Sequence, residues 1–247
     1  AIRSDSLVYK MGAAIAAQCK RLGIHINYAP DVDINNNPSN PVINDRSFGQ
    51  NKERVIQHGI AYMKGLQDHQ VMATAKHFPG HGYIKADSHL SISEDTRALD
   101  EIQSKDMSIF TSLIKHGLNA VMPSHVLYSA ADKNPAGFSS FWLKDQLREN
   151  FHFKGAIFSD DMSMKGAILG GEMKDRILKA LEAGCDMVLL CNSPQLVDEV
   201  LLQLDWKMSS ESMARLLSMK GFKTPHEALQ MTQEKGFKEM TSQIMAM

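Results

Sequence analysis

Short β-branched runs alternate with longer amphipathic stretches along this chain, and this alternation restricts the possible folds more than any other feature. The predicted strands cover residues 25–34, 71–77, 120–125, 155–160 and 186–191. The predicted helices between them cover residues 5–21, 52–69, 99–116, 141–149 and 174–183. Strands separated by helices at this spacing indicate a parallel sheet with the helices packed outside it.

Polar residues follow each predicted strand, and their placement favours a barrel. They are Asp31/Asp33, Lys76/His77, Ser124/His125, Ser159/Asp160/Asp161 and Asn192/Ser193. The carboxyl ends of barrel strands share one face, where such groups would converge, whereas a doubly wound sheet uses only one crevice. The expected fold is therefore an α/β TIM (β/α)8 barrel type. A closed barrel needs eight strands, and 201–206 could add at most a weak one. We expect the barrel to be incomplete at its N-terminus or open.

The composition describes an ordinary globular chain. Its 247 residues are 43% hydrophobic and 22% charged, with a formal net charge of -1, which suits one domain over 1–247. Clustered Lys and Arg are missing, which argues against a nucleic-acid partner. No apolar run or signal-peptide pattern points to a membrane or to secretion. Cys19, Cys185 and Cys191 are too sparse for a disulfide framework, so we expect reduced thiols in a cytoplasmic protein.

The motif KHFPGHG at 76–82, followed by Asp87-Ser88-His89, concentrates ionisable groups on a predicted loop that contains glycine and proline. Such groups are costly to bury unpaired, and loops that carry them on a rigid scaffold are usually sites. Lys76 and His77, at a strand end, offer hydrogen-bond donors to a ligand. Arg46, after the Asn/Pro-rich segment 35–45, offers a planar fork for oxygen acceptors. His81 is expected only to fix the loop by a hydrogen bond.

Asp160 ends a predicted strand, where its carboxylate could act as a nucleophile or stabilise a developing cation. Asp161 must face the other side of the strand and is expected to cap a helix beginning at Met162. Asp87 can meet the imidazole of His89, fix its tautomer and favour its charged form, which makes His89 a proton donor. A carboxylate nucleophile with a separate acid/base is the logic of retaining glycoside hydrolysis, although the usual acid there is a second carboxylate.

A divalent-ion site is the competing interpretation of these residues. Its ligands would come from His77, His81, Asp87, His89, His125 and Asp160. The tight histidine pairing of a rigid metal site is missing, and Lys76 beside His77 would repel a cation. We therefore do not expect a metal site.

Several longer motifs carry a resemblance to a known family. KHFPGHG, ADSH and FSDDMSMKGA, together with LGIHINYAPDVDI, DRSFG, KDMSIF, VMPSHVLYS and AGCDMVLLCN, occur in the expected order. They resemble the bacterial β-N-acetylhexosaminidases of glycoside hydrolase family 3, the cytoplasmic enzymes of peptidoglycan recycling. The resemblance implies a single TIM barrel without cofactor. It also implies that Asp160 is the nucleophile, His89 the acid/base and Asp87 its partner, and that Arg46, Lys76 and His77 bind N-acetylglucosamine.

The same resemblance implies a small carbohydrate or muropeptide substrate, N-acetylglucosamine β-linked to 1,6-anhydro-N-acetylmuramic acid, for a monomeric enzyme. Family members carry about two more N-terminal βα units, so the chain is expected to be an N-terminally truncated family 3 barrel domain. Two alternatives stay open. One is a catalytically impaired sugar-binding remnant of the same fold. The other is a family 3 β-glucosidase or xylosidase.

Overall fold

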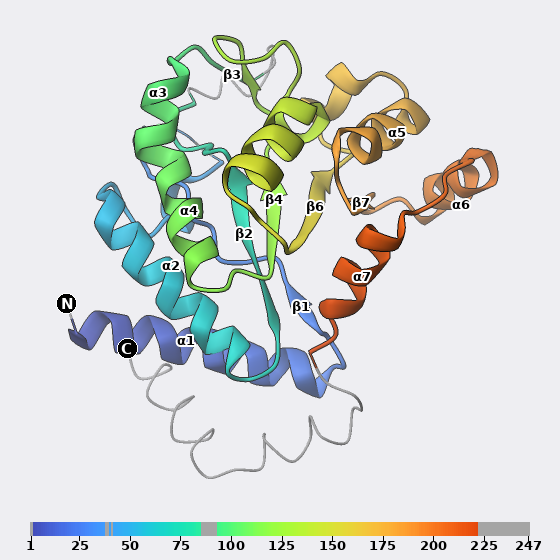
Figure 1. Cartoon of the computed structure of the whole chain (residues 1–247). Coiled ribbons are helices and arrows are strands. Elements are labelled where there is room, and N and C mark those ends of the chain that lie inside the picture. Colours follow the sequence, from blue (N-terminus) through green and yellow to red (C-terminus); the bar gives the residue numbers. More distant parts are fainter. Residues whose placement is uncertain (1, 38–39, 41, 85–92, 222–247) are drawn as a thin grey trace.

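The computed structural model describes residues 2–37, 40, 42–84 and 93–221. A parallel five-stranded sheet lies at its centre, in the order β1-β2-β4-β6-β7. The strands are β1 Ile26–Asn27, β2 Met72–Phe78, β4 Ala120–Pro123, β6 Ala156–Asp161 and β7 Met187–Leu189. They curl into an incomplete α/β barrel with helices outside it (Figure 1). The predicted fold class and all five predicted strands are confirmed.

Strand β1 is shorter than the predicted 25–34, because a proline interrupts its ladder. Pro30 has no N–H group to donate to a neighbouring strand. The chain beyond it still runs beside β2: the N–H of Lys76 donates to the carbonyl of Pro30 at 3.2 Å, and the N–H of Val32 donates to the carbonyl of Lys76 at 2.8 Å. The extended course therefore continues as far as the polar residues that follow β1.

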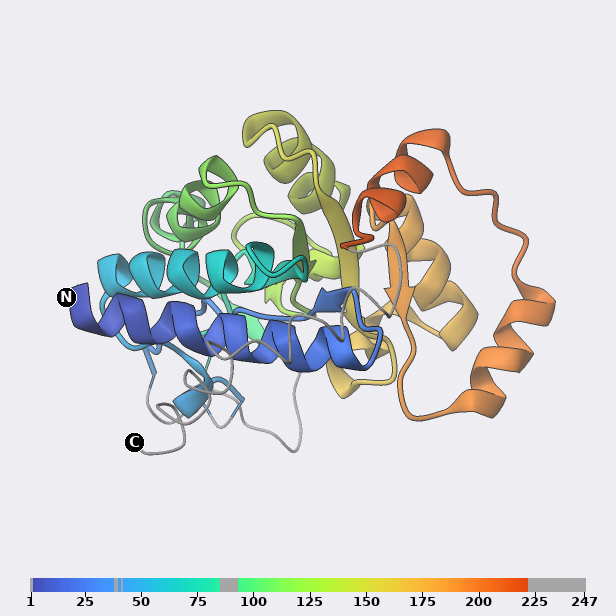
Figure 2. The same cartoon turned by 90° about the horizontal axis from the view of Figure 1, so that it is seen from below.

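The helices between the strands also match the prediction. They are α1 Ile2–Arg21, α2 Lys52–Gln67, the continuous helical stretch α3 Leu99–Ile102, η2 Gln103–Met107 and α4 Ser108–Lys115, then η4 Phe141–Asn150 and α5 Met173–Ala183. Helices η2 and η4 have π-type hydrogen bonding. Figure 2 shows α1 and α2 side by side. Gly12 permits this approach, because a Cβ there would lie 2.3 Å from the carbonyl oxygen of Tyr62.

The hydrophobic core lies between the sheet and these helices. Phe78, at the end of β2, is fully buried and meets Phe110 and Trp142 edge-on, with ring centroids 5.2 and 6.1 Å apart. Such edge-to-face pairs add stability beyond the area that they bury. The strand ends are thereby anchored to the helical layer, which gives the side chains beyond them a rigid base.

The last described segment is helical. Helices α6 Pro194–Gln203 and α7 Ser210–Ser218 follow β7, so the weak strand considered for 201–206 was wrong. That segment is apolar at Leu201 and Leu202, but both are exposed in α6 and neither pairs with the sheet. Met219, just after α7, packs with Met122 and Phe158 on the sheet.

Smaller elements complete the described chain. β3 Glu94–Asp95 pairs with β5 Leu127–Tyr128, and the 3-10 helices are η1 Asn44–Arg46, η3 Ala136–Phe138 and η5 Lys165–Gly170. All three cysteines are free thiols, as expected. Among the described residues no helix has the length and apolar character needed to cross a membrane.

Candidate active site

Polar groups from three strands meet at the carboxyl edge of the sheet, as the sequence predicts. Asp31 and Asp33 follow β1, Lys76 and His77 lie in β2, and Asp160 lies in β6. The Nε2 atom of His77 lies 4.0 Å from Oδ2 of Asp160. A register shift interrupts the pairing of β2 beside His77, and another interrupts that of β6 beside Asp160. Such irregularities change the direction in which side chains point and are common next to functional sites.

Asp33 is the centre of a buried hydrogen-bond cluster. Its side chain is fully buried, and its Oδ2 lies 2.7 Å from Nδ1 of His77. The same carboxylate accepts the backbone N–H of His77 at 3.3 Å and the backbone N–H of His81 at 2.6 Å. One side chain thus holds both histidines of the KHFPGHG motif. Sequence reasoning named Asp33 only as part of a polar strand end and missed this role.

Arg46 reaches the site through Asp31. Its Nη2 atom lies 3.2 Å from Oδ2 of Asp31, and its Nη1 donates to the carbonyl of Val42 at 2.9 Å. The Arg46 side chain is 42% exposed, whereas that of Asp31 is 7% exposed. The guanidinium therefore keeps an accessible face, suited to oxygen acceptors of a ligand.

Asp160 and Asp161 have different surroundings, as their alternation on a strand requires. Asp160 faces His77 with its side chain 18% exposed. Asp161 accepts the backbone N–H groups of Ser163 and Cys191, both at 3.0 Å, and the Ser163 hydroxyl at 2.6 Å. It forms an Asx turn and ties together the ends of β6 and β7. The predicted helix cap at Asp161 was wrong, because the next helix, η5, begins only at Lys165.

Burial shifts the ionisation of several groups at this edge. It raises the pKa of Asp31 to about 7, with the negative Asp33 adding to the rise and His77 and Arg46 opposing it. Burial lowers the pKa of His77 and favours its neutral form. It also lowers the pKa of Lys76, and the neighbouring positive Arg46 acts in the same direction. The site therefore combines neutral and charged groups at one edge of the sheet.

Close backbone packing shapes the KHFPGHG turn. A Cβ on Gly80, which has a φ of +147°, would lie 2.4 Å from the Cβ of Asp106, and a Cβ on Gly82 would lie 1.7 Å from the carbonyl oxygen of Ile34. Only glycine fits these two positions. The backbone of His81 supplies the loop-fixing hydrogen bond, to Asp33, rather than its ring. The His81 ring packs edge-on against that of His77, with centroids 5.8 Å apart.

A buried ion-pair network lies next to this turn. The Arg97 guanidinium donates to both oxygens of Asp95 and, at 2.8 Å, to Oδ2 of Asp106. All three side chains are at most 4% exposed. Because Asp106 also packs on Gly80, the network joins the turn to strand β3. The predicted acid/base His89 and its partner Asp87 belong to the segment between these elements and lie outside the described residues.

His125, a possible ligand in the metal interpretation, is not part of the group of potential ligands that the described residues bring together. Its Nε2 lies 3.1 Å from the backbone carbonyl of Asp161, and its ring stacks on Phe138. Within the described ranges the potential ligand atoms of Asp31, Asp33 and His77 lie within 4.8 Å of one another. In this group each carboxylate has a side chain of the protein as a donor or counter-charge: Nδ1 of His77 for Asp33 and the guanidinium of Arg46 for Asp31.

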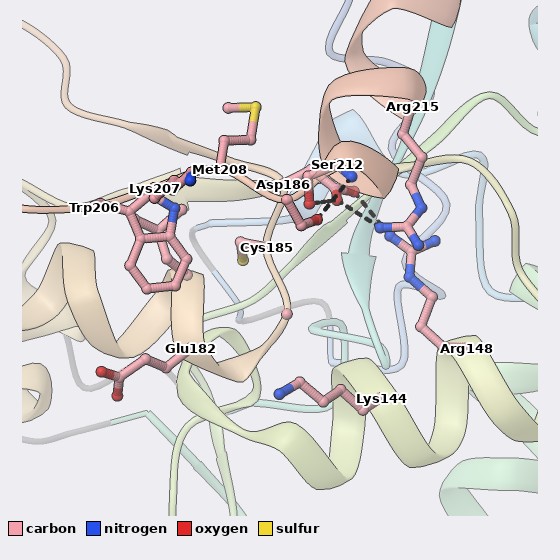
Figure 3. A pocket seen from close by; sticks show the side chains of 13 residues that line it. Lys144, Arg148, Glu182, Cys185, Asp186, Trp206, Lys207, Met208, Ser212 and Arg215 are labelled. Atoms are coloured by element: carbon pink, nitrogen blue, oxygen red, sulfur yellow. Dashed lines mark hydrogen bonds and ion pairs between the residues drawn. The ribbon is translucent and has the colours of Figure 1, made fainter.

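A second polar cluster lies at the amino edge of the sheet, far from these groups. Asp186, just before β7, is 1% exposed and binds Arg148 and Arg215 at 2.8 Å and Ser212 at 2.7 Å (Figure 3). It also accepts the backbone N–H of Ile157 at 2.8 Å. A cavity of about 410 Å³ adjoins these residues. Because the amino face of a barrel serves stability, we assign the Asp186 cluster to anchoring α7 rather than to chemistry.

The curled parallel sheet, with carboxylates, imidazoles and cations at its carboxyl edge, defines an α/β-barrel enzyme domain. Comparison with known proteins gives the family. Residues 1–219 match the glycosyl hydrolase family 3 N terminal domain. The chain is similar to a beta-hexosaminidase of Methylobacillus flagellatus, 42% identical over 95% of this chain and 67% of that protein. A beta-hexosaminidase of Hydrogenovibrio crunogenus is 45% identical over 87% of this chain and 60% of that protein.

Among solved structures, NagZ from Neisseria gonorrhoeae in complex with N-trifluoroacetyl-D-glucosamine superposes with a TM-score of 0.90. It is 37% identical, and the match covers 98% of this chain and 70% of that one. The chain therefore belongs to glycosyl hydrolase family 3. It spans between 60% and 67% of the length of the two beta-hexosaminidases compared above.

Proposed function

We propose that the chain hydrolyses terminal β-linked N-acetylglucosamine as a retaining exo-β-N-acetylglucosaminidase. The observation that carries this proposal is Asp160, a partly exposed carboxylate facing His77 at the carboxyl edge of a family 3 domain. Its support from relatives is that the proteins compared above are beta-hexosaminidases. We further propose that the catalytic groups all belong to one barrel domain covering the chain.

Asp160 acts as the nucleophile in this proposal. Its carboxylate attacks the anomeric carbon, the glycosidic C–O bond breaks, and the leaving oxygen takes a proton from His89. Water then attacks the glycosyl–Asp160 ester while His89 takes up a proton, which releases the sugar with its configuration retained. Asp87 positions the imidazole of His89 and stabilises its charged form. The atoms and charges balance over the two steps, and no cofactor is required.

Arg46, Lys76 and His77 bind the sugar in this proposal. Arg46 has an exposed guanidinium anchored on Asp31, and Lys76 and His77 extend from β2 beside Asp160. All three carry polar atoms that can form hydrogen bonds with a sugar. The N-trifluoroacetyl-D-glucosamine in the structure of the N. gonorrhoeae protein supports an amino sugar as the ligand class.

The natural substrate that we propose is N-acetylglucosamine β-linked to 1,6-anhydro-N-acetylmuramic acid, with or without a peptide. This assignment places the protein in peptidoglycan recycling, as a cytoplasmic monomer. Its support is the family membership together with the motifs that resemble the recycling enzymes.

Release of 4-nitrophenol from 4-nitrophenyl N-acetyl-β-glucosaminide tests the proposed activity. Asp160→Asn removes the nucleophile at constant shape and should reduce the rate at least about 1,000-fold, the scale of losing a nucleophile. Glu199→Gln, an exposed change on α6, is the matched control and should keep the wild-type rate. A wild-type rate equal to that of Asp160→Asn would refute the proposal. Faster release from the β-glucoside would instead indicate the glucosidase alternative.

A further inference from the structure

We propose that Asp33 is a positioning residue that fixes the tautomer of His77, so that Nε2 of His77 presents a lone pair to the reaction site. This inference rests on the proposed function for its catalytic meaning. Its geometric basis lies entirely in described residues, and Asp33 belongs to none of the groups assigned above to nucleophilic attack, proton transfer or sugar binding.

The contacts of Asp33 favour its ionised form. An ionised carboxylate has only acceptor positions, and Asp33 faces donors on both oxygens. The N–H of His81 lies 2.6 Å from Oδ1, and the N–H of His77 lies 3.3 Å from each oxygen. Burial raises the pKa of Asp33, while the charge and N–H of His81 oppose that rise. Because hydrogen bonds from backbone N–H groups favour the charged form of a carboxylate, we take Asp33 to be ionised.

The contact with Asp33 determines which ring nitrogen of His77 carries the hydrogen. Nδ1 of His77 lies 2.7 Å from Oδ2 of Asp33. Because an ionised Asp33 can only accept, Nδ1 must carry the hydrogen and donate it. A carboxylate on one imidazole nitrogen decides which form the other nitrogen takes. In the neutral ring, which burial favours, Nε2 is then an acceptor without a hydrogen.

The acceptor nitrogen of His77, Nε2, points toward Asp160. Nε2 of His77 lies 4.0 Å from Oδ2 of Asp160, the proposed nucleophile. With a lone pair there, His77 donates no hydrogen bond that would lower the nucleophilicity of the carboxylate. The same lone pair can accept a hydrogen bond from a sugar hydroxyl. His77 would thus recognise a hydroxyl as a donor, whereas Arg46 and Lys76 recognise oxygens as acceptors.

Asp31 provides the contrast that makes the assignment specific. It also lies near the imidazole, but its Oδ2 is 3.9 Å from Nδ1 of His77, beyond hydrogen-bonding distance. Its nearest cation is Arg46. A general effect of negative charge would come from both carboxylates, whereas control of the tautomer should come from Asp33 alone.

Asp33→Asn is the informative substitution. Its amide oxygen can keep the short bond from the N–H of His81, which turns the amide NH₂ group toward Nδ1 of His77. Nδ1 must then accept, and the ring proton moves to Nε2, facing Asp160. We expect kcat/KM to fall about 10- to 100-fold, the range known for removal of the partner that orients a metal-bound histidine. Asp33→Glu, which restores a carboxylate, should recover part of that loss.

The direct test is nitrogen NMR of the protein labelled with ¹⁵N-histidine at pH 7.5, with the His77 signals assigned by their loss in His77→Gln. Wild type should show a hydrogen on Nδ1 and none on Nε2. Asp33→Asn should show the reverse, and the matched control Asp31→Asn should keep the wild-type pattern.

A hydrogen on Nε2 in wild type, or reversal in Asp31→Asn, would overturn the proposal. The wild-type spectrum decides even if Asp33→Asn fails to fold. These spectra need no turnover, so an inactive protein with the expected tautomer would refute the proposed function and leave the assignment to Asp33 intact. An active protein with the opposite tautomer would refute the assignment to Asp33 and leave the proposed function intact.

Discussion

Asp31 offers a prediction with a magnitude that follows from its surroundings. Its carboxylate is 7% exposed and lies beside the buried Asp33. Burial, followed by the negative charge of Asp33, raises its pKa from 3.8 to about 7, against the opposing effects of His77 and Arg46. The native protein therefore holds a carboxylate at neutral pH that would be more stable in water. Asp31→Asn removes this charge and keeps the shape of the side chain.

The raised pKa fixes both the sign and the size of the effect. Between pH 4 and pH 7 the native state binds a proton at Asp31 that the unfolded chain has released, so the free energy of unfolding falls as the pH rises. A shift of about three units corresponds to about 4 kcal/mol above pH 7, at 1.36 kcal/mol per unit. About 2.5 kcal/mol of this fall occurs between pH 5 and pH 8, because the unfolded carboxyl is already largely ionised at pH 5.

Urea unfolding at pH 5 and pH 8, followed by tryptophan fluorescence, measures this difference. The free energy of unfolding of Asp31→Asn, relative to wild type, should rise by about 2–3 kcal/mol between the two pH values. The exposed control Glu199→Gln should show no comparable change. A relative stability of Asp31→Asn that is constant, or that falls with pH, would refute the interpretation of Asp31 as a strained carboxylate.

Three further predictions follow from other parts of the structure. Asp186→Asn should lower the free energy of unfolding in urea by about 3 kcal/mol, because it leaves Arg148 and Arg215 without their shared charge partner; a loss no larger than that of Glu199→Gln would contradict the anchoring role. Arg97→Met should cost about 3–5 kcal/mol in the same assay, because Asp95 and Asp106 stay buried without a counter-charge; an unchanged unfolding midpoint would count against it. EDTA should leave release of 4-nitrophenol unchanged, and an activity lost to EDTA and restored by Zn²⁺ would revive the metal interpretation.

The sheet could be predicted from sequence because its signals are local. Apolar runs near residues 72–77, 120–123 and 156–160 mark strands that are largely buried on both faces, and the intervening helices have a clear amphipathic period. The extent of β1 could not be predicted in the same way. Its residues beyond Pro30 remain extended, but the ladder depends on which backbone donors the neighbouring strand meets.

Parts of the candidate site were predictable and others were not. Lys76, His77 and Asp160 follow or end apolar strands, and the shared carboxyl edge of a parallel sheet brings them together. The role of Asp33 depends on His77, 44 residues further along the chain. Its spacing from Asp31, two residues along an extended segment, gave a signal that both could face one side. The groups that contact Asp31 and Asp33 on that side can be identified only in the folded chain.

The false strand at 201–206 and the false cap at Asp161 have different origins. Leu201 and Leu202 continue helix α6 and are exposed. Asp161 has the residue type of a cap, yet its oxygens are used by Ser163 and by the backbone of Cys191, 30 residues away. The contact with Cys191 is not visible in a short window of sequence.

Covalent trapping tests the central claim most directly. A fluorinated N-acetylglucosaminyl fluoride should form a stable glycosyl-enzyme, because the ring fluorine slows release of the intermediate more than the reactive leaving group slows its formation. Mass spectrometry of the digested protein should locate one added sugar on Asp160. Labelling on Asp161, or a wild-type protein that hydrolyses the β-N-acetylglucosaminide without any label on Asp160, would contradict the assignment of the nucleophile.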